Sequence, residues 1–81
     1  MNKVLRYNVI FRPEPEGGFT VIVPSLQGCV TYGKDLKEAK KMAIDAINVY
    51  IASLKKHKES IPTDEESFFA SVDVKNSPVY A

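Results

Sequence analysis

Histidine, cysteine and tryptophan are almost missing from this 81-residue chain, which contains one His, one Cys and no Trp. A zinc site takes three or four protein ligands, so Cys29 and His57 alone cannot build one. A single cysteine also excludes an intrachain disulfide framework. We expect no metal and no other cofactor, and we interpret Cys29 as a small buried strand residue.

Strong net charge and long apolar runs are missing as well. The chain carries 11 basic and 10 acidic residues, a net charge of +1, which gives no general attraction to nucleic acid or to an anionic membrane. No apolar run approaches the roughly 18 residues of a membrane-spanning helix, and no signal-peptide pattern opens the chain. These absences predict a soluble, cytoplasmic protein that does not contact membranes.

The length suits one domain, residues 1–81, in which residues 76–81 look like a tail. A hydrophobic content of 44% is too high for a disordered chain. A chain this short buries only about 60–65% of its unfolded surface, so its core is small. Self-association into a homodimer or a larger assembly would supplement that core.

Alternating apolar residues predict three consecutive strands. Lys3–Arg12 alternates with a period of two, and a turn rich in Pro and Gly separates it from a second alternating run, Phe19–Val23. Cys29–Tyr32 is β-rich enough for a third strand. The short links between these runs predict an antiparallel meander.

A long amphipathic helix should follow, from about Leu36 to about Lys58. Asp35 and Glu38 have the spacing of a capping box. The expected buried stripe consists of Leu36, Ala39, Ala43, Ala46, Ile47, Tyr50 and Leu54. Further apolar residues flank this stripe on both sides, namely Met42, Ile44, Val49 and Ile51. The apolar arc is therefore wider than one small sheet needs, which indicates contact with a partner.

A fourth strand is expected after a polar connection, Ile61–Glu66. Its apolar residues alternate with others at Phe68, Ala70, Val72 and Val74. The predicted order is β-β-β-α-β, an α+β fold in which one long helix packs on one face of the sheet.

No residue pattern predicts catalysis, and we assign no catalytic, cofactor-binding or metal residues. His57 lies among lysines at the end of the helix, where positive charge suits the helix dipole. Gly17 and Gly18 lead from strand to strand, whereas a phosphate-binding loop leads from strand to helix. The helix lysines are interrupted by acids and lack interleaved aromatic residues, so we interpret them as a solvated face: Lys37, Lys41, Lys55 and Lys56.

The acidic residues also give no nuclease pattern. A metal-dependent nuclease needs two or more acids that converge from neighbouring strands on Mg²⁺. Only Asp73 falls in an expected strand, on its polar face. Acids of the turn, the helix and the connection are interpreted as solvated or capping charges: Glu14, Glu16, Asp35, Glu38, Asp45, Asp64, Glu65 and Glu66.

The order of these motifs nevertheless resembles a known family. The pattern is Tyr7-x-Val9-x-Phe11, then Gly18-Phe19-x-Val21-x-Val23-Pro24-x-Leu26-x-Gly28-Cys29-x-Thr31-x-Gly33, then Leu36-x-Glu38-Ala39 and Ala43-x-x-Ala46-Ile47. It covers about residues 4–74 and resembles the HicB antitoxin family. The resemblance implies a partial RNase H-like fold without nuclease carboxylates.

The resemblance also implies a partner and a way of acting. The protein would be the antitoxin of a toxin–antitoxin pair and would bind HicA, a small RNA-cleaving toxin, covering its catalytic histidine or its RNA surface. Many family members carry a C-terminal DNA-binding domain; none follows Ala81 in this sequence, so direct DNA binding is not expected. Ser25 and Lys34 stand where the family often has acidic or small residues.

Two other functions stay open at this stage. One is a metal-dependent nuclease that retains RNase H-like activity, and the other is a homo-oligomeric scaffold without a toxin partner. The residues that contact a toxin are unknown from the motif, and the exposed residues around the hairpin turn and Gly33 are the candidates.

Overall fold

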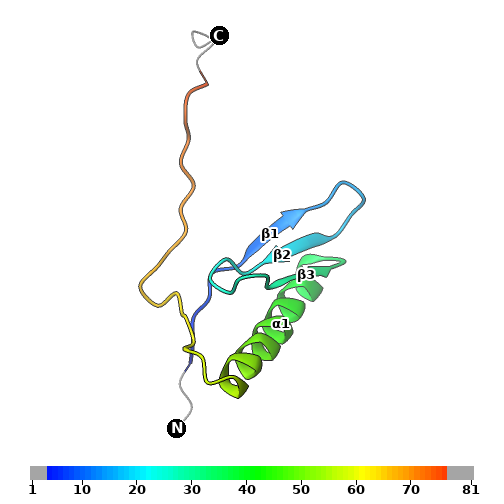
Figure 1. Cartoon of the computed structure of the whole chain (residues 1–81). Coiled ribbons are helices and arrows are strands. Elements are labelled where there is room, and N and C mark those ends of the chain that lie inside the picture. Colours follow the sequence, from blue (N-terminus) through cyan, green and yellow to red (C-terminus); the bar gives the residue numbers. More distant parts are fainter. Residues whose placement is uncertain (1–3, 77–81) are drawn as a thin grey trace.

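Three short strands and one long helix form the body of the protein in a computed structural model that describes residues 4–76 (Figure 1). The strands are β1 (Ile10–Pro13), β2 (Phe19–Ile22) and β3 (Val30–Gly33), and the helix is α1 (Leu36–Lys56). α1 lies across one face of the sheet, over β3 and β2. The predicted α+β class, with one helix on one sheet face, is confirmed.

The sheet is the expected antiparallel meander, with the strand order β1-β2-β3. Phe11 lies opposite Val21, and Val21 lies opposite Thr31. The first strand is shorter than predicted, because the β1–β2 ladder ends where Ile10 faces Ile22. Beyond Ile22 the chain turns away at Pro24, so residues 4–9 have no β2 partner to pair with.

After β2 the chain forms a loop from Val23 to Cys29, which backbone hydrogen bonds between its two ends close. The Val23 N–H donates to the Cys29 carbonyl at 3.0 Å, and the Cys29 N–H donates to the Leu26 carbonyl at 2.9 Å. Gly28 has a φ of 79°, a conformation that costs other residues about 1–2 kcal/mol. The loop thereby turns the Leu26 side chain inward, where it is fully buried.

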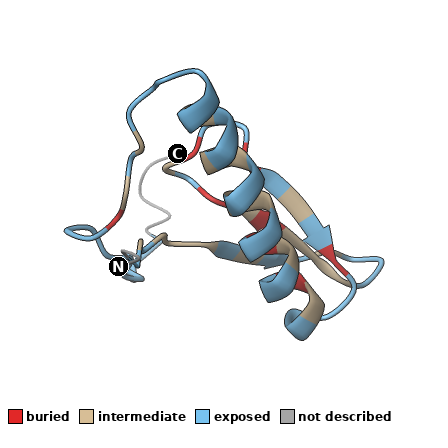
Figure 2. Ribbon diagram, turned by 90° about the horizontal axis from the view of Figure 1, so that it is seen from below, coloured by how far each residue is buried: buried red, intermediate tan, exposed pale blue. Residues whose placement is uncertain are grey.

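The core is small and consists of two clusters of buried side chains (Figure 2). Val21, Ala39 and Ala43 form the first, between the sheet and the first half of α1. The second cluster contains Val23, Leu26 and Cys29, against which half-buried side chains of α1 pack: Ala46, Ile47 and Tyr50.

Small residues on α1 allow it to lie close to the sheet. A Cβ added at Gly33 would overlap the backbone N and Cα of Ala39, so β3 and α1 touch nearly backbone to backbone. Of the predicted stripe, Ala39 and Ala43 are buried and the positions from Ala46 onward are half-buried. Leu36 was expected on that stripe and is instead 45% exposed, because α1 first meets the sheet at Ala39.

The predicted capping residues begin the helix. The Asp35 carboxylate accepts from the Glu38 N–H at 2.8 Å, and the Glu38 side chain accepts from the Lys34 N–H at 2.8 Å. The first contact is the one that the capping-box spacing predicts. In the second, Glu38 accepts from Lys34, one residue before the N-cap, and not from the N–H of Asp35 itself.

The helix ends at Lys56, two residues before the expected end at Lys58. The Glu59 N–H donates to the Leu54 carbonyl at 2.9 Å and the Lys58 N–H donates to the Lys55 carbonyl at 3.1 Å. This is the hydrogen-bond pattern of a Schellman motif. Lys58 takes the left-handed position, with a φ of 56°, that glycine usually occupies. The sequence therefore lacks the glycine that usually marks the end of a helix.

The expected fourth strand is not formed in the described part of the chain. Residues 67–76 run away from the body and pair with no strand (Figure 1). Phe68 is 85% exposed and Val74 is 82% exposed. The radius of gyration is 16.1 Å, against about 12 Å for a compact domain of this length.

Candidate interaction surface

The residues tested for catalysis lie apart from one another in the structure. The His57 imidazole is exposed at the end of α1, where its Nδ1 lies 2.8 Å from the Ser53 carbonyl oxygen. Cys29 is buried in the core, and burial raises the pKa of its thiol. The exposed position of His57 and the burial of Cys29 are as predicted. Cys29 is not a strand residue, however, because β3 begins at Val30 and ends at Gly33, one residue later at each end than expected.

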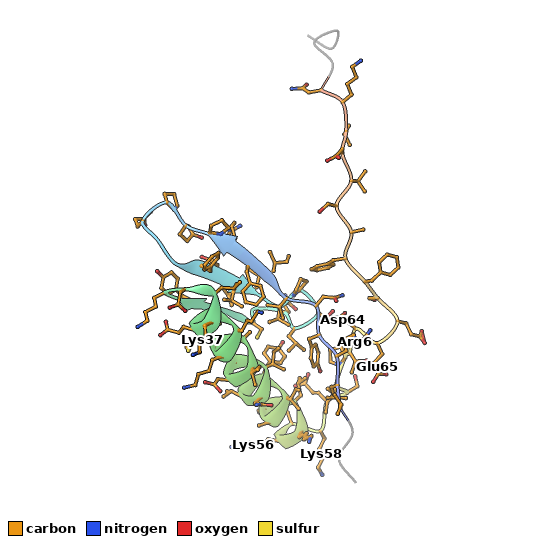
Figure 3. The ribbon with its side chains drawn as sticks, turned by 180° about the vertical axis from the view of Figure 1, so that it is seen from behind. Arg6, Lys37, Lys56, Lys58, Asp64 and Glu65 are labelled. Carbon is orange, nitrogen blue, oxygen red and sulfur yellow. The ribbon has the colours of Figure 1, made fainter. Side chains whose placement is uncertain are left out.

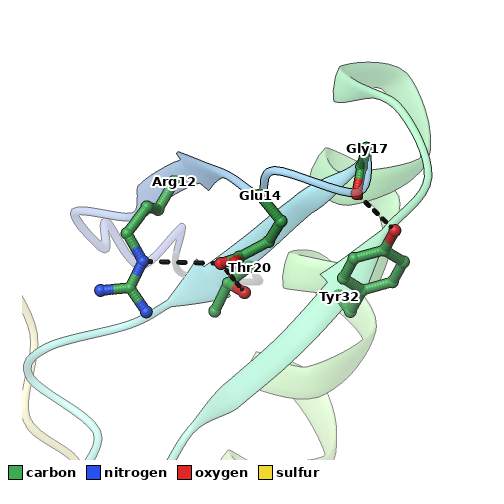
Figure 4. A network of polar contacts seen from close by, with 5 residues as sticks. All are labelled: Arg12, Glu14, Gly17, Thr20 and Tyr32. Atoms are coloured by element: carbon green, nitrogen blue, oxygen red, sulfur yellow. Dashed lines mark hydrogen bonds and ion pairs between the residues drawn. The ribbon is translucent and has the colours of Figure 1, made fainter.

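The acids are also dispersed. Within residues 4–76, no group of three or more His, Cys, Asp or Glu side chains is arranged to hold a metal ion. Asp35 and Glu38 cap α1, and the Asp73 residue of the unformed strand is exposed. Glu14 lies at the hairpin, where it accepts from Thr20 Oγ1 at 2.5 Å and faces Arg12 Nε at 3.6 Å (Figure 4).

The tip of the β1–β2 hairpin is held by a second contact. The Tyr32 hydroxyl of β3 donates to the Gly17 carbonyl at 2.9 Å (Figure 4). A side chain at Gly18 would overlap the Tyr32 ring, so glycine is required there for the ring to pass. These contacts explain Gly17 and Gly18 as turn residues, as predicted.

Asp64 is buried, which corrects the expectation that it is a solvated acid of the connection. Its side chain is 5% exposed. Its Oδ1 accepts from Ser25 Oγ at 2.5 Å and its Oδ2 accepts from the Asn8 N–H at 2.9 Å. The Asp64 N–H donates to the Arg6 carbonyl at 2.9 Å. We call Asn8, Ser25 and Asp64 the Asp64 latch, because they fasten the connection to the segment before β1 and to the loop after β2.

The latch fixes the charge state of its carboxylate. The hydrogen bond from Ser25, and after it the one from the Asn8 backbone, lower the pKa of Asp64, while burial acts in the opposite direction. The neighbouring Tyr7 hydroxyl donates to the Pro62 carbonyl at 2.6 Å. Burial, and then the charges of Asp64 and Glu65, raise the pKa of Tyr7. Sequence patterns give no signal for the latch, because its members are 39 and 56 positions apart.

An apolar groove of about 950 Å³ opens beside the latch, between the N-terminal segment with β1 and one flank of α1. We call it the β1-side groove. Ile44 on its wall is 61% exposed, and Phe69 of the C-terminal segment reaches into it. The other apolar side chains that line it are Leu5, Val9, Phe11, Ala43, Ile47 and Ile51.

A smaller hollow of about 470 Å³ lies at the opposite edge, between β3 and the other flank of α1. We call it the β3-side surface. Val30 is 58% exposed there and Val49 is 71% exposed. Its remaining apolar lining comes from Cys29, Met42, Ala46 and Tyr50. Both flanks of α1 are thus apolar and exposed, as the wide arc in the sequence predicts.

A few charged side chains line these surfaces, namely Lys40 and Lys55 in the β1-side groove and Asp45 at the β3-side surface. Figure 3 shows Lys37 near the start of α1, Lys56 and Lys58 at and just beyond its end, and Arg6, Asp64 and Glu65 gathered where the connection crosses the N-terminal segment. The helix lysines are exposed, with Asp45 among them on the same outer face. This mixture of charges agrees with a solvated face. In the described part of the chain, no helix is long and apolar enough to cross a membrane.

Comparison with known proteins gives one consistent family. Residues 7–79 match the family described as the HicB-like antitoxin of bacterial toxin–antitoxin systems. The UPF0150 protein Ta0767 of Thermoplasma acidophilum is 48% identical over 60 residues, which cover 74% of this chain and 87% of that protein. A UPF0150 protein of Synechocystis, ssr1765, is 30% identical over 78% of this chain and 80% of its own length.

A UPF0150 protein of Helicobacter pylori is also similar, with 30% identity over 73% of this chain and 82% of its own length. The match spans β1, β2, β3, α1 and the latch, so it includes every element described above. The resemblance seen in the sequence motifs is confirmed. The chain belongs to the HicB-like antitoxin family of bacterial toxin–antitoxin systems.

Proposed function

We propose that this protein neutralises a small HicA-type RNA-cleaving toxin by binding it directly. The observation that carries the proposal is the family match over residues 7–79. The structure supports it with an exposed apolar surface on a chain whose acids are dispersed over its described residues. The protein acts in this proposal as a binding module and not as an enzyme.

We assign toxin binding to the β3-side surface. It combines the exposed side chains of Val30 and Val49 with an outer strand edge, since no strand in the described part of the chain pairs with the far side of β3. Exposed apolar side chains next to an unpaired strand edge are features of protein interaction sites. The surface adjoins Gly33 and Tyr32, near the region that the sequence indicated as a candidate.

The family resemblance adds three further proposals. The fold is a partial RNase H-like one, with the fourth strand completed by residues 68–74. The protein forms a homodimer or a larger assembly, consistent with a core of only six buried hydrophobic residues among those described. It acts in the cytoplasm as a single domain and does not bind DNA directly.

Co-expression with a HicA-like gene from the same locus tests the toxin proposal. The wild-type protein should restore growth and co-purify with the toxin. Val49→Asp should abolish both, because it places a charge on the β3-side surface. The matched control is Ala52→Asp, which adds the same charge at an exposed position on the outer face of α1. If Val49→Asp still restores growth and still co-purifies with the toxin, this surface is rejected. If the wild-type protein does neither, the toxin partner is rejected.

A further inference from the structure

We propose that residues 68–74 form a strand on the β1 edge of a second copy of this chain, and that two copies exchange these segments reciprocally. The segment is extended, apolar at alternate positions and exposed along its length. Its first part passes Ile10 at the start of β1, and the outer edge of β1 pairs with no strand in residues 4–76. The exchange goes beyond toxin binding and assigns the contact through which the chain self-associates.

The latch determines where the segment begins. Asp64 donates its N–H to the Arg6 carbonyl, as a residue of a strand parallel to the N-terminal segment would. The Asn8 N–H, which would be the next donor of that ladder, is instead taken by the Asp64 side chain at 2.9 Å. The Ser67 N–H then donates to the Asp64 carbonyl at 3.1 Å, closing a turn. The ladder within the chain therefore stops at Asn8, and the segment is directed outward.

The alternation of side chains favours a second copy over the chain's own edge. Phe69 reaches into the β1-side groove of its own chain, and it lies beside Ile10. In an extended segment, Phe68, Val72 and Val74 point to the opposite side from Phe69. Pairing with its own β1 in the register that keeps Phe69 in the groove would leave those three side chains facing away from it. A second copy can cover them while Phe69 stays in the groove of its own chain.

The surface area that the exchange would bury is that of a stable dimer. Phe68, Phe69, Val72 and Val74 are 85%, 55%, 80% and 82% exposed. With large apolar residues contributing on the order of 150–200 Å² each, they expose on the order of 500 Å² per chain. Two exchanged segments, together with the groove surfaces that they cover, would bury roughly 2,000 Å² in total, which is the size of a stable interface.

The groove also has room for a second segment. Its volume of about 950 Å³ is far larger than the single Phe69 ring that enters it. Its exposed wall residue Ile44 gains cover only from something placed over β1 and the flank of α1. Exchange by two-fold symmetry would cover both grooves with identical contacts, as closed dimers require.

Sedimentation equilibrium of the full chain tests the exchange by comparing two neighbouring substitutions. Val72→Asp should raise the dimer dissociation constant by on the order of 30-fold, because Val72 enters the second copy. Ser71→Asp is the matched control, exposed and one position away, and should change the constant less than about threefold because it faces the other side. Equal effects of the two substitutions, or a wild-type monomer at about 100 μM, would overturn the proposal.

Nuclear Overhauser contacts in a mixture of isotope-labelled and unlabelled chains identify the strand partner. Exchange predicts contacts between the methyl groups of Val72 or Val74 in one copy and Phe11 in the other. Contacts confined to single chains would show that the segment folds onto its own β1 and would overturn the exchange. Toxin co-purification provides a separate readout: Val72→Asp should keep it and Val49→Asp should lose it, so the two proposals can fail independently.

Discussion

Replacing Asp64 by Asn tests whether the latch holds the connection to the sheet. The substitution preserves the size of the side chain and removes its charge. An Asn oxygen can accept from the Asn8 N–H, but the amide then faces Ser25, whose hydroxyl must become the acceptor. If the amide introduced at position 64 is flipped instead, its NH₂ group faces the Asn8 backbone N–H, and two donors meet without an acceptor.

The structure sets the size of the effect. Hydrogen bonds to a charged group contribute about 1.5–3 kcal/mol each, and neutral ones about 0.5–1.5 kcal/mol. Two bonds of the Asp64 carboxylate become neutral in the variant, so Asp64→Asn should lower the free energy of unfolding by about 1–3 kcal/mol. Asp64→Ala should cost more, because it leaves the part-buried Asn8 N–H without an acceptor.

Urea unfolding at fixed protein concentration measures this difference, and its pH dependence gives the signature. The folded pKa of Asp64 is lowered, while the unfolded value is about 3.9. Its stabilisation is therefore complete above about pH 5 and disappears as the pH falls through the folded pKa. The gap between wild type and Asp64→Asn should be constant at neutral pH and close in acid.

Amide hydrogen exchange distinguishes local release from global unfolding. The Asp64 and Asn8 amides should exchange faster in Asp64→Asn, while amides of the α1 core keep most of their protection. Glu66→Gln is the control, since Glu66 is exposed, and it should change stability by less than about 0.5 kcal/mol. An Asp64→Asn protein as stable as the wild type at pH 7 would refute the role given to the latch.

Four further substitutions test the local contacts by thermal or urea unfolding. Gly33→Ala should cost more than about 2 kcal/mol, because its Cβ overlaps the Ala39 backbone, whereas Gly28→Ala meets no atom and should cost about 1–2 kcal/mol from its positive φ alone. Lys58→Gly should raise the free energy of unfolding by about 0.5–1 kcal/mol, because glycine adopts the left-handed position without strain. Asp35→Ala should lower the free energy of unfolding by about 0.5–2 kcal/mol through loss of the helix cap. For each substitution, a change in stability of the opposite sign would contradict the contact assigned to that residue.

Local patterns in the sequence predict most of the body. The period of two before Pro13, the turn glycines and the capping residues at Asp35 each depend on neighbours within a few positions. The structure contains the turn and the cap, but it forms the first strand only over Ile10–Pro13. The helix end was placed two residues too late because Lys58 occupies a position where glycine is the usual signal. Leu36 was misplaced because periodicity gives the face of a helix and not the point at which the helix meets the sheet.

Long-range contacts could not be predicted in this way. Asp64 stands among Glu65 and Glu66 in a polar connection, and nothing local distinguishes it from those acids. Its burial depends on Asn8 and Ser25, which the fold brings to it from distant positions. Similarly, the alternation at residues 68–74 predicts a strand but not its partner, because the sequence does not specify which sheet edge the strand pairs with.

The two edges of the sheet lead to different partners in these proposals. β1 and β3 lie on either side of β2, so the β1-side groove and the β3-side surface occupy opposite flanks of α1. Segment exchange covers the β1 edges of both copies and leaves both β3-side surfaces exposed. A dimer formed in this way retains two equivalent toxin sites, and two-fold symmetry makes them identical. The antitoxin dimer would therefore bind two toxin molecules without competition between self-association and toxin binding.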